Sequence, residues 1–210
     1  MKERVFVYGA GGHAKVVIDI VEKQGCCQIA FLVDDNPDLW QKRVYGYPVT
    51  GGKASLLSAE DPISLLPSIV AIGNNPLREN IGFWLLNNGF KLFTAIHPSA
   101  QIARGVLISD GTAVMAGCVV NPDTAIGRNT ILNTGSTIDH DCIIGNNVHI
   151  APGCHLCGNV TIGDGSFIGA GTTIIPEITV GHGVSVGAGS VVTRDVPDGS
   201  KVAGVPCRPI

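Results

Sequence analysis

Residues 126–150 read IGRNTILNTGSTIDHDCIIGNNVHI, and an aliphatic residue returns at every sixth position of this stretch. The same register continues in both directions and covers seventeen successive positions without a break. These positions are Ile96, Ile102, Ile108, Val114, Val120, Ile126, Leu132, Ile138, Ile144, Ile150, Leu156, Ile162, Ile168, Ile174, Val180, Val186 and Val192. A period of six matches neither a helix nor the alternation of a simple strand, whereas it is typical of the hexapeptide β-helix. The sequence therefore predicts a parallel β-helix over the second half of the chain.

Each six-residue repeat has a second position that suits the inside of such a solenoid. Four places after the aliphatic residue, most residues are small or β-branched: Thr112, Cys118, Thr124, Thr130, Ser136, Cys142, Val148, Cys154, Val160, Ser166, Thr172, Val184 and Ser190. Asn, Asp, Gly and Pro crowd the places between, where the backbone must turn and can need a positive φ. Two inward positions per repeat predict one short strand and one corner, so three repeats close a triangular coil. Coils stacked at roughly 4.8 Å would make about five to six turns, on the order of 25 Å of solenoid.

Composition excludes some classes of protein. The chain has 28 Gly, 5% aromatic residues, 45% hydrophobic residues and a formal net charge of −3. No uninterrupted apolar run is long enough to span a bilayer, and there is no basic cluster, so we expect neither a membrane nor nucleic acid as a partner. The chain starts with Met-Lys-Glu-Arg and continues directly into a predicted strand. We therefore expect no signal peptide and a cytoplasmic location.

The cysteines are expected to be reduced and structural. The seven are Cys26, Cys27, Cys118, Cys142, Cys154, Cys157 and Cys207. Three of them occupy the small inward position of the repeat, where a thiol is an ordinary core group. None has the paired spacing of a zinc site, so no metal is expected.

Residues 1–96 follow a different pattern, typical of a small α/β domain, and residues 97–210 are expected to form the solenoid domain. Strands are predicted over residues 5–8, 28–33, 68–72 and 91–96, and helices over 14–23 and 76–86. Parallel strands joined by helices bring their following loops to one edge of the sheet, where open α/β sheets bind ligands.

A glycine turn follows the first predicted strand. Gly9, Gly11 and Ala14 match the spacing of a dinucleotide-binding turn, and the acidic pair Asp34–Asp35 follows. A helix amino terminus with a bare glycine backbone favours a phosphate group. Fewer than a hundred residues leave no room for a full NAD domain, so a nucleotide-linked ligand fits better than a dinucleotide. The alternative is that the glycines only allow a tight strand-to-helix turn.

Several motifs together resemble those of a known family. They are Tyr8-Gly-Ala-Gly-Gly-His13, Ile72-Gly-Asn-Asn75 with Arg78, Ile138-Asp-His-Asp141, His149-Ile-Ala-Pro-Gly153, Phe167-Ile-Gly-Ala-Gly171, Val186-Gly-Ala-Gly-Ser190, Asp195-Val-Pro197 and Gly204-Val-Pro206. Over essentially its whole length, the chain resembles the bacterial sugar acetyltransferases typified by NeuD and PglD.

The resemblance implies a left-handed parallel β-helix, a homotrimer with active sites between neighbouring solenoids, and acetyl-CoA as acetyl donor. It also implies a nucleotide-activated amino sugar as acceptor, commonly acetylated at the C4 amine of a 4-amino-4,6-dideoxyhexose for surface glycan synthesis. The amino-terminal domain would then hold the nucleotide sugar, and the solenoid would hold the coenzyme.

Acetyl transfer to an amine requires a base, and the ordinary pKa of histidine suits this role near neutral pH. The six histidines are His13, His97, His140, His149, His155 and His182. His140 lies two places after an aliphatic position and His149 one place before another, so both are expected to lie on corners or outward positions, available to a ligand or a neighbouring subunit. By resemblance, His140 is the general base, Asp141 orients it and raises its basicity, and His149 contacts the coenzyme.

The resemblance assigns further residues to the two ligands. Ala170 and Ala188 are expected where backbone groups meet the pantetheine arm. The residues expected to contact the nucleotide sugar are Gly11, Gly12, His13, Asp34, Asp35 and Asn74. A helix or turn cap is the alternative role for the two aspartates. Of the other histidines, we expect His155 and His182 to be solvated and His97 to lie at the domain junction.

Three other functions stay open at this point. The first is O-acetylation of a sugar or sialic acid. The second is a zinc-dependent γ-type carbonic anhydrase, which shares the solenoid, although the nine- and six-residue spacings of His140, His149 and His155 do not converge obviously on one ion. The third is a non-catalytic nucleotide-sugar binding protein. No residue decides the nucleotide base or the sugar.

Overall fold

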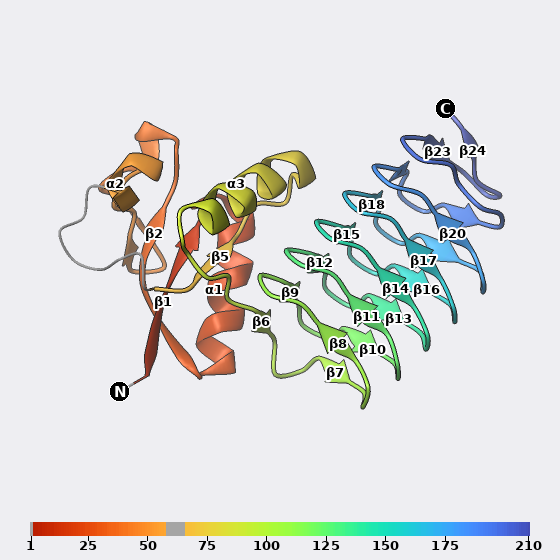
Figure 1. Ribbon diagram of the computed structural model, residues 1–210, viewed down its shortest axis with the longest axis horizontal. Coiled ribbons are helices and arrows are strands. Elements are labelled where there is room, and N and C mark those ends of the chain that lie inside the picture. The colour runs from red at the N-terminus through yellow and green to blue at the C-terminus, as the bar shows by residue number, and fades with distance from the viewer. Residues whose placement is uncertain (1, 58–65) are drawn as a thin grey trace. The chain divides into compact units, whose positions relative to one another are not determined.

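The computed structural model describes residues 2–57 and 66–210 (Figure 1). The chain divides into two compact units, Met1–Pro98 and Ser99–Ile210. The first unit is an α/β domain and the second is a solenoid of parallel strands, so the fold class predicted from the sequence, an α/β domain followed by a parallel β-helix, is confirmed.

The amino-terminal unit is built on a three-stranded parallel sheet with the strand order β2-β1-β5. Its elements are β1 (Glu3–Tyr8), α1 (Gly12–Gln24), β2 (Cys27–Val33), the 3-10 helix η1 (Pro37–Leu39), the hairpin of β3 (Arg43–Val44) and β4 (Tyr47–Pro48), α2 (Lys53–Leu57), β5 (Ser68–Val70) and α3 (Asn75–Asn87). Strand β1 is central and pairs with both neighbours. Its last four residues are all buried, as expected for a parallel strand that is covered on both faces.

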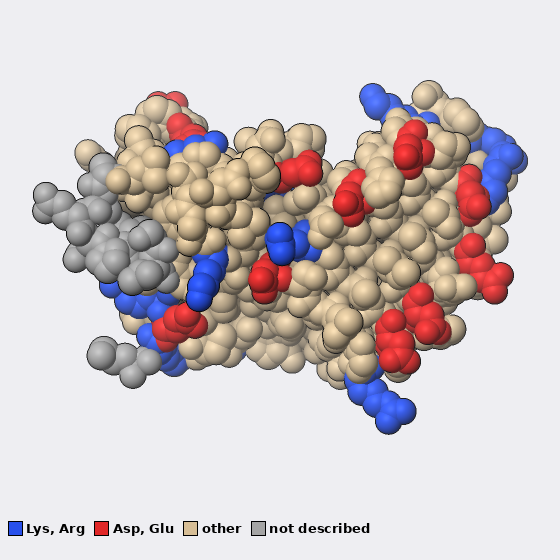
Figure 2. All heavy atoms as spheres, viewed as in Figure 1, with Lys and Arg blue, Asp and Glu red and all other residues tan. Residues whose placement is uncertain are grey.

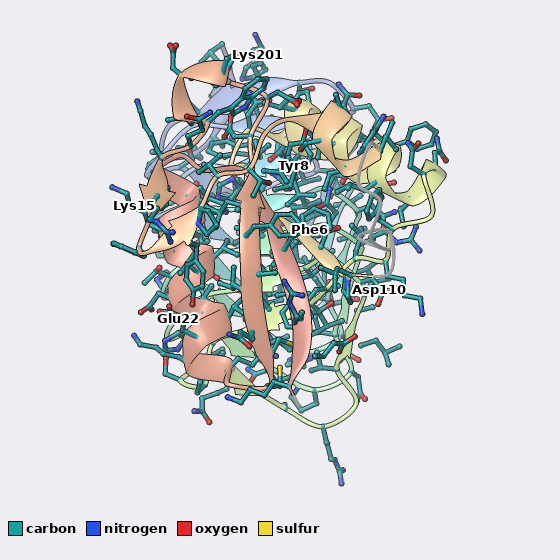
Figure 3. All side chains as sticks on the ribbon, turned by 90° about the vertical axis from the view of Figure 1, so that its left-hand side faces the viewer. Phe6, Tyr8, Lys15, Glu22, Asp110 and Lys201 are labelled. Atoms are coloured by element: carbon teal, nitrogen blue, oxygen red, sulfur yellow. The ribbon has the colours of Figure 1, made fainter. Side chains whose placement is uncertain are left out.

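An aromatic cluster forms the core on one side of β1. Phe6 and Tyr8 are two residues apart along β1 (Figure 3) and therefore point to the same face of the sheet. The Phe6 ring stacks on Phe31 of β2 with centroids 5.4 Å apart and meets Phe90 edge-on at 5.6 Å. Helix α3 contributes Ile81 and Leu85 to the same cluster.

The strand predicted over residues 91–96 is wrong in part. Leu92 makes only an isolated bridge with Ser68, and the regular strand is the two-residue β6 (Ala95–Ile96). Phe93 donates its backbone N–H to the Ser68 carbonyl, but β5 ends two residues later. Residues 91–93 therefore meet β5 at Ser68 alone and form no regular strand.

Three sheets of short strands form the solenoid, and the pairing is parallel except between the last two strands (Figure 1). The strands are β7 (Gln101–Ile102), β8 (Leu107–Ile108), β9 (Ala113–Val114), β10 (Val119–Val120), β11 (Ala125–Ile126), β12 (Ile131–Leu132), β13 (Thr137–Ile138), β14 (Ile143–Ile144), β15 (His149–Ile150), β16 (His155–Leu156), β17 (Thr161–Ile162), β18 (Phe167–Ile168), β19 (Thr173–Ile174), β20 (Thr179–Val180), β21 (Ser185–Val186), β22 (Val191–Val192), β23 (Lys201–Ala203) and β24 (Arg208–Pro209). The predicted aliphatic residue is the second residue of every strand from β6 to β22, so the six-residue period is confirmed.

Each sheet forms one face of the solenoid. The β13 face contains β7, β10, β13, β16, β19 and β22, and the β14 face contains β8, β11, β14, β17 and β20. The β15 face contains β9, β12, β15, β18 and β21, extended by β23 and β24. Paired residues on neighbouring strands are eighteen positions apart, as in Ile138 and Leu156, so one coil takes three repeats.

Hydrogen bonds explain why the second inward position carries hydroxyl and thiol groups. Thr130 Oγ1 donates to the Gly145 carbonyl at 2.8 Å and accepts the Val148 N–H at 3.1 Å. Equivalent pairs of bonds are made by Thr112, Thr124 and Ser166. Thiols donate to corner carbonyls in the same way from Cys118, Cys142 and Cys154. Burial raises the pKa of all three thiols, and all seven cysteines are free.

The corners of the solenoid use a left-handed backbone conformation. Every sixth residue from Gly105 to Gly189 has a φ between 55° and 78°, and these residues are Gly, Asn or Asp except for Glu177. A glycine that directly follows an aliphatic residue is needed for a different reason, which is the close approach of neighbouring coils. A Cβ on Gly127 would lie 2.5 Å from the Gly145 carbonyl of the next coil, so only glycine allows the coils to stack there.

Two observations concern nucleic acid and membranes, the partners that the sequence does not predict. On the face seen in Figure 2, the described Lys and Arg side chains lie singly or in small groups among uncharged atoms and form no extended basic area. None of the helices within residues 2–57 and 66–210 has the length and apolar character needed to cross a membrane.

Candidate active site

His140 lies on the corner that follows β13, and its neighbours fix its surroundings. The Nδ1 atom of His140 is 2.8 Å from Asp141 Oδ2, and 59% and 62% of these two side chains are exposed. Asp139 Oδ1 accepts the backbone N–H of His140 at 2.9 Å and the side-chain amide of Asn121 at 2.8 Å. The corner itself is held by Thr124, whose hydroxyl donates to the Asp139 carbonyl.

The charges around His140 favour its protonated form. The hydrogen bond to Asp141, followed by the negative charge of Asp139, raises the pKa of His140 above its ordinary value. Hydrogen bonds from Asn121 and from the His140 amide lower the pKa of Asp139. When Nδ1–H donates to Asp141, Nε2 is the ring atom that can accept a proton from a ligand. The geometry is that of a general base with an orienting carboxylate.

Gly158 of the next coil lies against the imidazole of His140. A Cβ on residue 158 would be 2.7 Å from His140 Cε1 and 2.8 Å from Nε2. The ring therefore rests on a backbone without a side chain, and its position depends on that glycine. Sequence reasoning did not single out Gly158, although its position eighteen residues after His140 was a signal that could have found it.

The structure corrects one expectation about His149. His149 does occupy an outward position, at the start of β15, but only 8% of it is exposed. The ring of Phe167, its partner on the next strand, meets the imidazole edge-on with centroids 5.2 Å apart. The Nε2 atom lies 3.1 Å from Nδ2 of Asn133, a residue that sequence reasoning missed. The imidazole is thus held between neighbours and has little free surface in one chain.

Ala170 and Ala188 lie on an exposed corner of the solenoid. They are eighteen residues apart and directly stacked, and the Gly189 N–H donates to the Ala170 carbonyl at 2.8 Å. This corner follows β18 and β21 of the β15 face, whereas the His140 corner follows β13 of the β13 face. The structure therefore brings His149, Ala170 and Ala188 to one face and its edge, but it does not bring them together with His140 in one chain.

A cavity of about 320 Å³ lies at the carboxyl ends of the parallel strands in the amino-terminal unit. Its lining is Tyr8, Gly9, Gly11, Gly12, His13, Asp34, Asp35, Ala71, Ile72, Gly73, Leu77 and Ile81. Figure 3 shows Tyr8 toward the end of β1 that leads into the glycine turn. Five of the six residues predicted to contact the nucleotide sugar are brought together here, at the amino terminus of α1, where a phosphate is favoured.

The two aspartates of this cavity have different partners. Asp34 uses Oδ2 to accept the Ala10 N–H at 2.8 Å and Oδ1 to accept the Asn36 N–H at 2.9 Å, so it also serves as the predicted alternative, a turn cap. Asp35 accepts the Tyr8 hydroxyl at 2.7 Å and the Lys53 N–H at 2.9 Å. Burial, followed by the hydrogen bond to Asp35, raises the pKa of Tyr8.

Asn74, the sixth predicted residue, caps a helix. Its Oδ1 accepts the Leu77 N–H at 3.0 Å at the start of α3. Its neighbours Gly73 and Leu77 line the cavity, whereas Asn74 itself does not belong to that lining.

The remaining histidines have other surroundings. His155 is exposed, as expected, with Nδ1 2.9 Å from the Thr137 hydroxyl, and His182 is exposed but accepts the Asp164 N–H at 3.0 Å. His97 is buried, and its Nε2 atom lies 4.0 Å from Oδ2 of Asp19. In the described part of the chain, no three His, Cys, Asp or Glu side chains are grouped as a metal site.

Comparisons with known proteins agree with both halves of this description. The model of the PglD N-terminal domain matches residues 4–84, and the model of six bacterial transferase hexapeptide repeats matches residues 141–176. The chain is similar to the acetyltransferase domain of PglB from Neisseria gonorrhoeae FA1090, with 40% identity, a TM-score of 0.93 and full coverage of both chains.

Two further relatives are described together with a ligand or a substrate. PerB from Caulobacter crescentus, solved in complex with CoA and GDP-perosamine, is 40% identical with a TM-score of 0.89, covering 98% of this chain and 96% of that one. The UDP-N-acetylbacillosamine N-acetyltransferase of Bacillus subtilis is 33% identical over 114 residues, 54% of this chain, and the match spans only about half (52%) of that curated relative. The chain belongs to the NeuD/PglD-like family of acetyl-CoA-dependent sugar N-acetyltransferases.

Proposed function

We propose that this protein transfers the acetyl group of acetyl-CoA to the C4 amine of a nucleotide-linked 4-amino-4,6-dideoxy sugar, with His140 as the general base. The observation that carries the proposal is the His140–Asp141 pair on an exposed corner, with Nε2 directed away from its carboxylate partner. We include in the proposal a cytoplasmic location and a role in the synthesis of surface glycans.

The relatives support nitrogen rather than oxygen as the acceptor. PerB of Caulobacter crescentus is described with GDP-perosamine, and the Bacillus subtilis relative is named an N-acetyltransferase of a UDP-linked sugar. The Neisseria gonorrhoeae domain has been solved in complex with acetyl coenzyme A. The cavity at the glycine turn supports the proposal, because a helix amino terminus with a glycine backbone favours the phosphates that such sugars carry.

The proposed reaction has two steps, and one proton moves in each of them. The neutral sugar amine attacks the thioester carbonyl while His140 Nε2 takes a proton from the nitrogen, so that the C–N bond forms. The C–S bond then breaks, and the CoA thiolate leaves and takes up the proton held by His140. Asp141 keeps Nδ1–H oriented and stabilises the imidazolium that forms between the two steps.

A homotrimer is part of the proposal, because the residues proposed for the base and for the coenzyme do not lie together in one chain. The His140 corner and the corner of Ala170 and Ala188 lie at opposite edges of the β13 face. The β14 face also carries an apolar outward column, in which Leu107 and Ile143 are largely exposed and flank Ala125. Exposed apolar columns of this kind favour contact with another copy.

The test is an assay of thiol release from acetyl-CoA with a panel of acceptors. UDP-, dTDP- and GDP-linked 4-amino sugars are compared with a sialic acid as the hydroxyl control. We expect thiol release with at least one amino sugar and none with sialic acid. Release with sialic acid alone would establish O-acetylation, and nucleotide-sugar binding by calorimetry without any release would establish a binding protein.

A further inference from the structure

Two adjacent cysteines, Cys26 and Cys27, bring their thiols together at the start of β2. Their Sγ atoms lie 3.5 Å apart. Neighbouring residues of a regular strand point to opposite faces of the sheet, which would separate the two sulfurs. Here Cys26 precedes the strand and directly follows Gly25, which ends α1 in the left-handed region with a φ of 71°. Because the chain bends at this point, both thiols reach the same side.

The two thiols differ in exposure. All seven cysteines lie in the described part of the chain, and Cys26 alone among them is exposed. Cys27 is 7% exposed and lines a cavity of about 430 Å³ with Lys2 and Arg4, whose positive charges favour a thiolate. Burial, followed by the hydrogen bond to Cys26, outweighs these charges and raises the pKa of Cys27. A reagent from solvent therefore meets Cys26 first, with a second thiol held beside it.

We propose that Cys26 and Cys27 form a redox-active dithiol, which hydrogen peroxide converts into a disulfide between the two neighbours. In the first step the Cys26 thiolate attacks a peroxide oxygen and the O–O bond breaks. A sulfenic acid forms, and the released hydroxide takes a proton from solvent to become water. In the second step the Cys27 sulfur attacks the Cys26 sulfur, the S–O bond breaks, and the leaving hydroxide takes the Cys27 proton. Two thiols thus lose two electrons in total, and one peroxide is reduced to two waters.

The adjacency of the two cysteines makes such a disulfide easy to reduce. Disulfide partners usually have Cα atoms about 4.4–6.8 Å apart, whereas a trans peptide holds neighbouring Cα atoms at about 3.8 Å. The Cys26–Cys27 peptide is trans, so the bond would be strained, and strained disulfides have higher reduction potentials than structural ones. The bond would also close no long loop, so it would add little stability. These properties suit a reversible modification.

The thiols of the solenoid provide the contrast. Cys118, Cys142 and Cys154 are fully buried, and each donates to a backbone carbonyl at a corner. Cys157 is partly exposed and is the most accessible thiol outside the Cys26–Cys27 pair. A reagent that reacts by exposure alone should therefore modify Cys26 and then Cys157, whereas a reaction that needs two neighbouring thiols should be confined to the pair.

The test is treatment of the intact protein with a small excess of hydrogen peroxide, followed by mass spectrometry. Trypsin leaves both cysteines on one peptide, residues 24–42, which contains no other cysteine. We expect this peptide to lose two hydrogens and to stop reacting with iodoacetamide while Cys157 can still be alkylated. Reduced glutathione, which leaves structural disulfides intact, should restore both thiols.

Single variants separate the pair from the other thiols. Cys26→Ser changes an exposed side chain, and its peptide should not lose two hydrogens. Cys157→Ser is the matched control and should lose two hydrogens at the wild-type rate. Oxidation of Cys26 to a sulfinic acid, a disulfide between Cys26 residues of two chains, or oxidation of the pair no faster than that of Cys157 would each overturn the inference. None of these measurements uses acetyl transfer, so their outcome leaves the proposed function untouched.

Discussion

At the residue scale, the candidate base depends on a corner conformation that few side chains adopt. Asp141 has a φ of 58° and is bonded to the imidazole of its chain neighbour. Asp and Asn both tolerate this left-handed region, so Asp141→Asn keeps the backbone and removes only the negative charge. The role of the charge can therefore be measured separately from the fold.

We predict that Asp141→Asn shifts the acid limb of the pH profile of kcat/KM to lower pH. His140 must be neutral to accept a proton, so activity falls as the pH drops through its pKa. Asp141 raises that pKa, and its replacement lowers it. The rate on the plateau should also fall, because a weaker base removes the proton less well. An unchanged acid limb would show that the titrating group is not His140.

A second prediction at this scale concerns Gly158. In Gly158→Ala the added Cβ would lie 2.7 Å from His140 Cε1, so the imidazole must move. We expect kcat to fall by about 10²-fold, the typical effect of a displacement near 1 Å, while KM for acetyl-CoA stays within a few-fold. Steady-state kinetics and the thermal midpoint are the measurements. An unchanged kcat in a folded variant would mean that the ring position is not critical.

At the element scale, the inward hydroxyl ladder joins each coil to the next. Thr130 satisfies one N–H and one carbonyl of the following coil, and both of those groups lie in the solenoid wall. A valine of similar shape would leave both without this partner. The ladder therefore adds hydrogen-bond specificity to the aliphatic packing that closes each coil.

We predict that Thr130→Val destabilises the protein by about 1–3 kcal/mol, the usual effect of leaving buried polar groups without a partner. Thr173→Val is the control, because Thr173 takes the outward position of β19 and should change stability by less than about 0.5 kcal/mol. Urea unfolding of both variants is the measurement. Equal midpoints for the two variants would contradict the role of the ladder.

The sequence predicted the elements that local rules control and missed those that depend on distant neighbours. The six-residue period predicted the positions of the strands from β6 to β22, because each repeat packs against similar repeats of the same chain. The strand predicted over residues 91–96 was wrong in part, because the pairing of its first residues depends on the length of β5, which residues 91–96 do not encode. Asn133 was not predicted as a neighbour of His149, since the two side chains belong to neighbouring coils and meet only in three dimensions.

At the scale of the whole molecule, the separation of the two corners makes the proposed site a shared one. His140 and Ala170 lie at opposite edges of the β13 face, so the proposed site takes the Ala170 corner from another copy. A variant altered at one corner should therefore complement a variant altered at the other. Such complementation distinguishes a site between subunits from a site within one chain.

We predict that His140→Ala and Ala170→Trp each lose most of their activity alone and regain activity when they are co-expressed. Mixed trimers would contain some interfaces in which both contributing corners are wild type. Thiol release is the readout, and native mass spectrometry verifies that mixed trimers form. Mixed trimers without activity would place the whole site within one chain.

The most direct measurement of the central claim is the rate of thiol release by His140→Ala with the best acceptor of the panel. We predict a loss of about 10²- to 10⁴-fold, the range for removal of a general base. The oligomeric state, the thermal midpoint and the affinity for acetyl-CoA should match those of wild type. His155→Ala, an exposed histidine of the same solenoid, should keep full activity. Near-normal turnover by His140→Ala would contradict the assignment of His140 as the base.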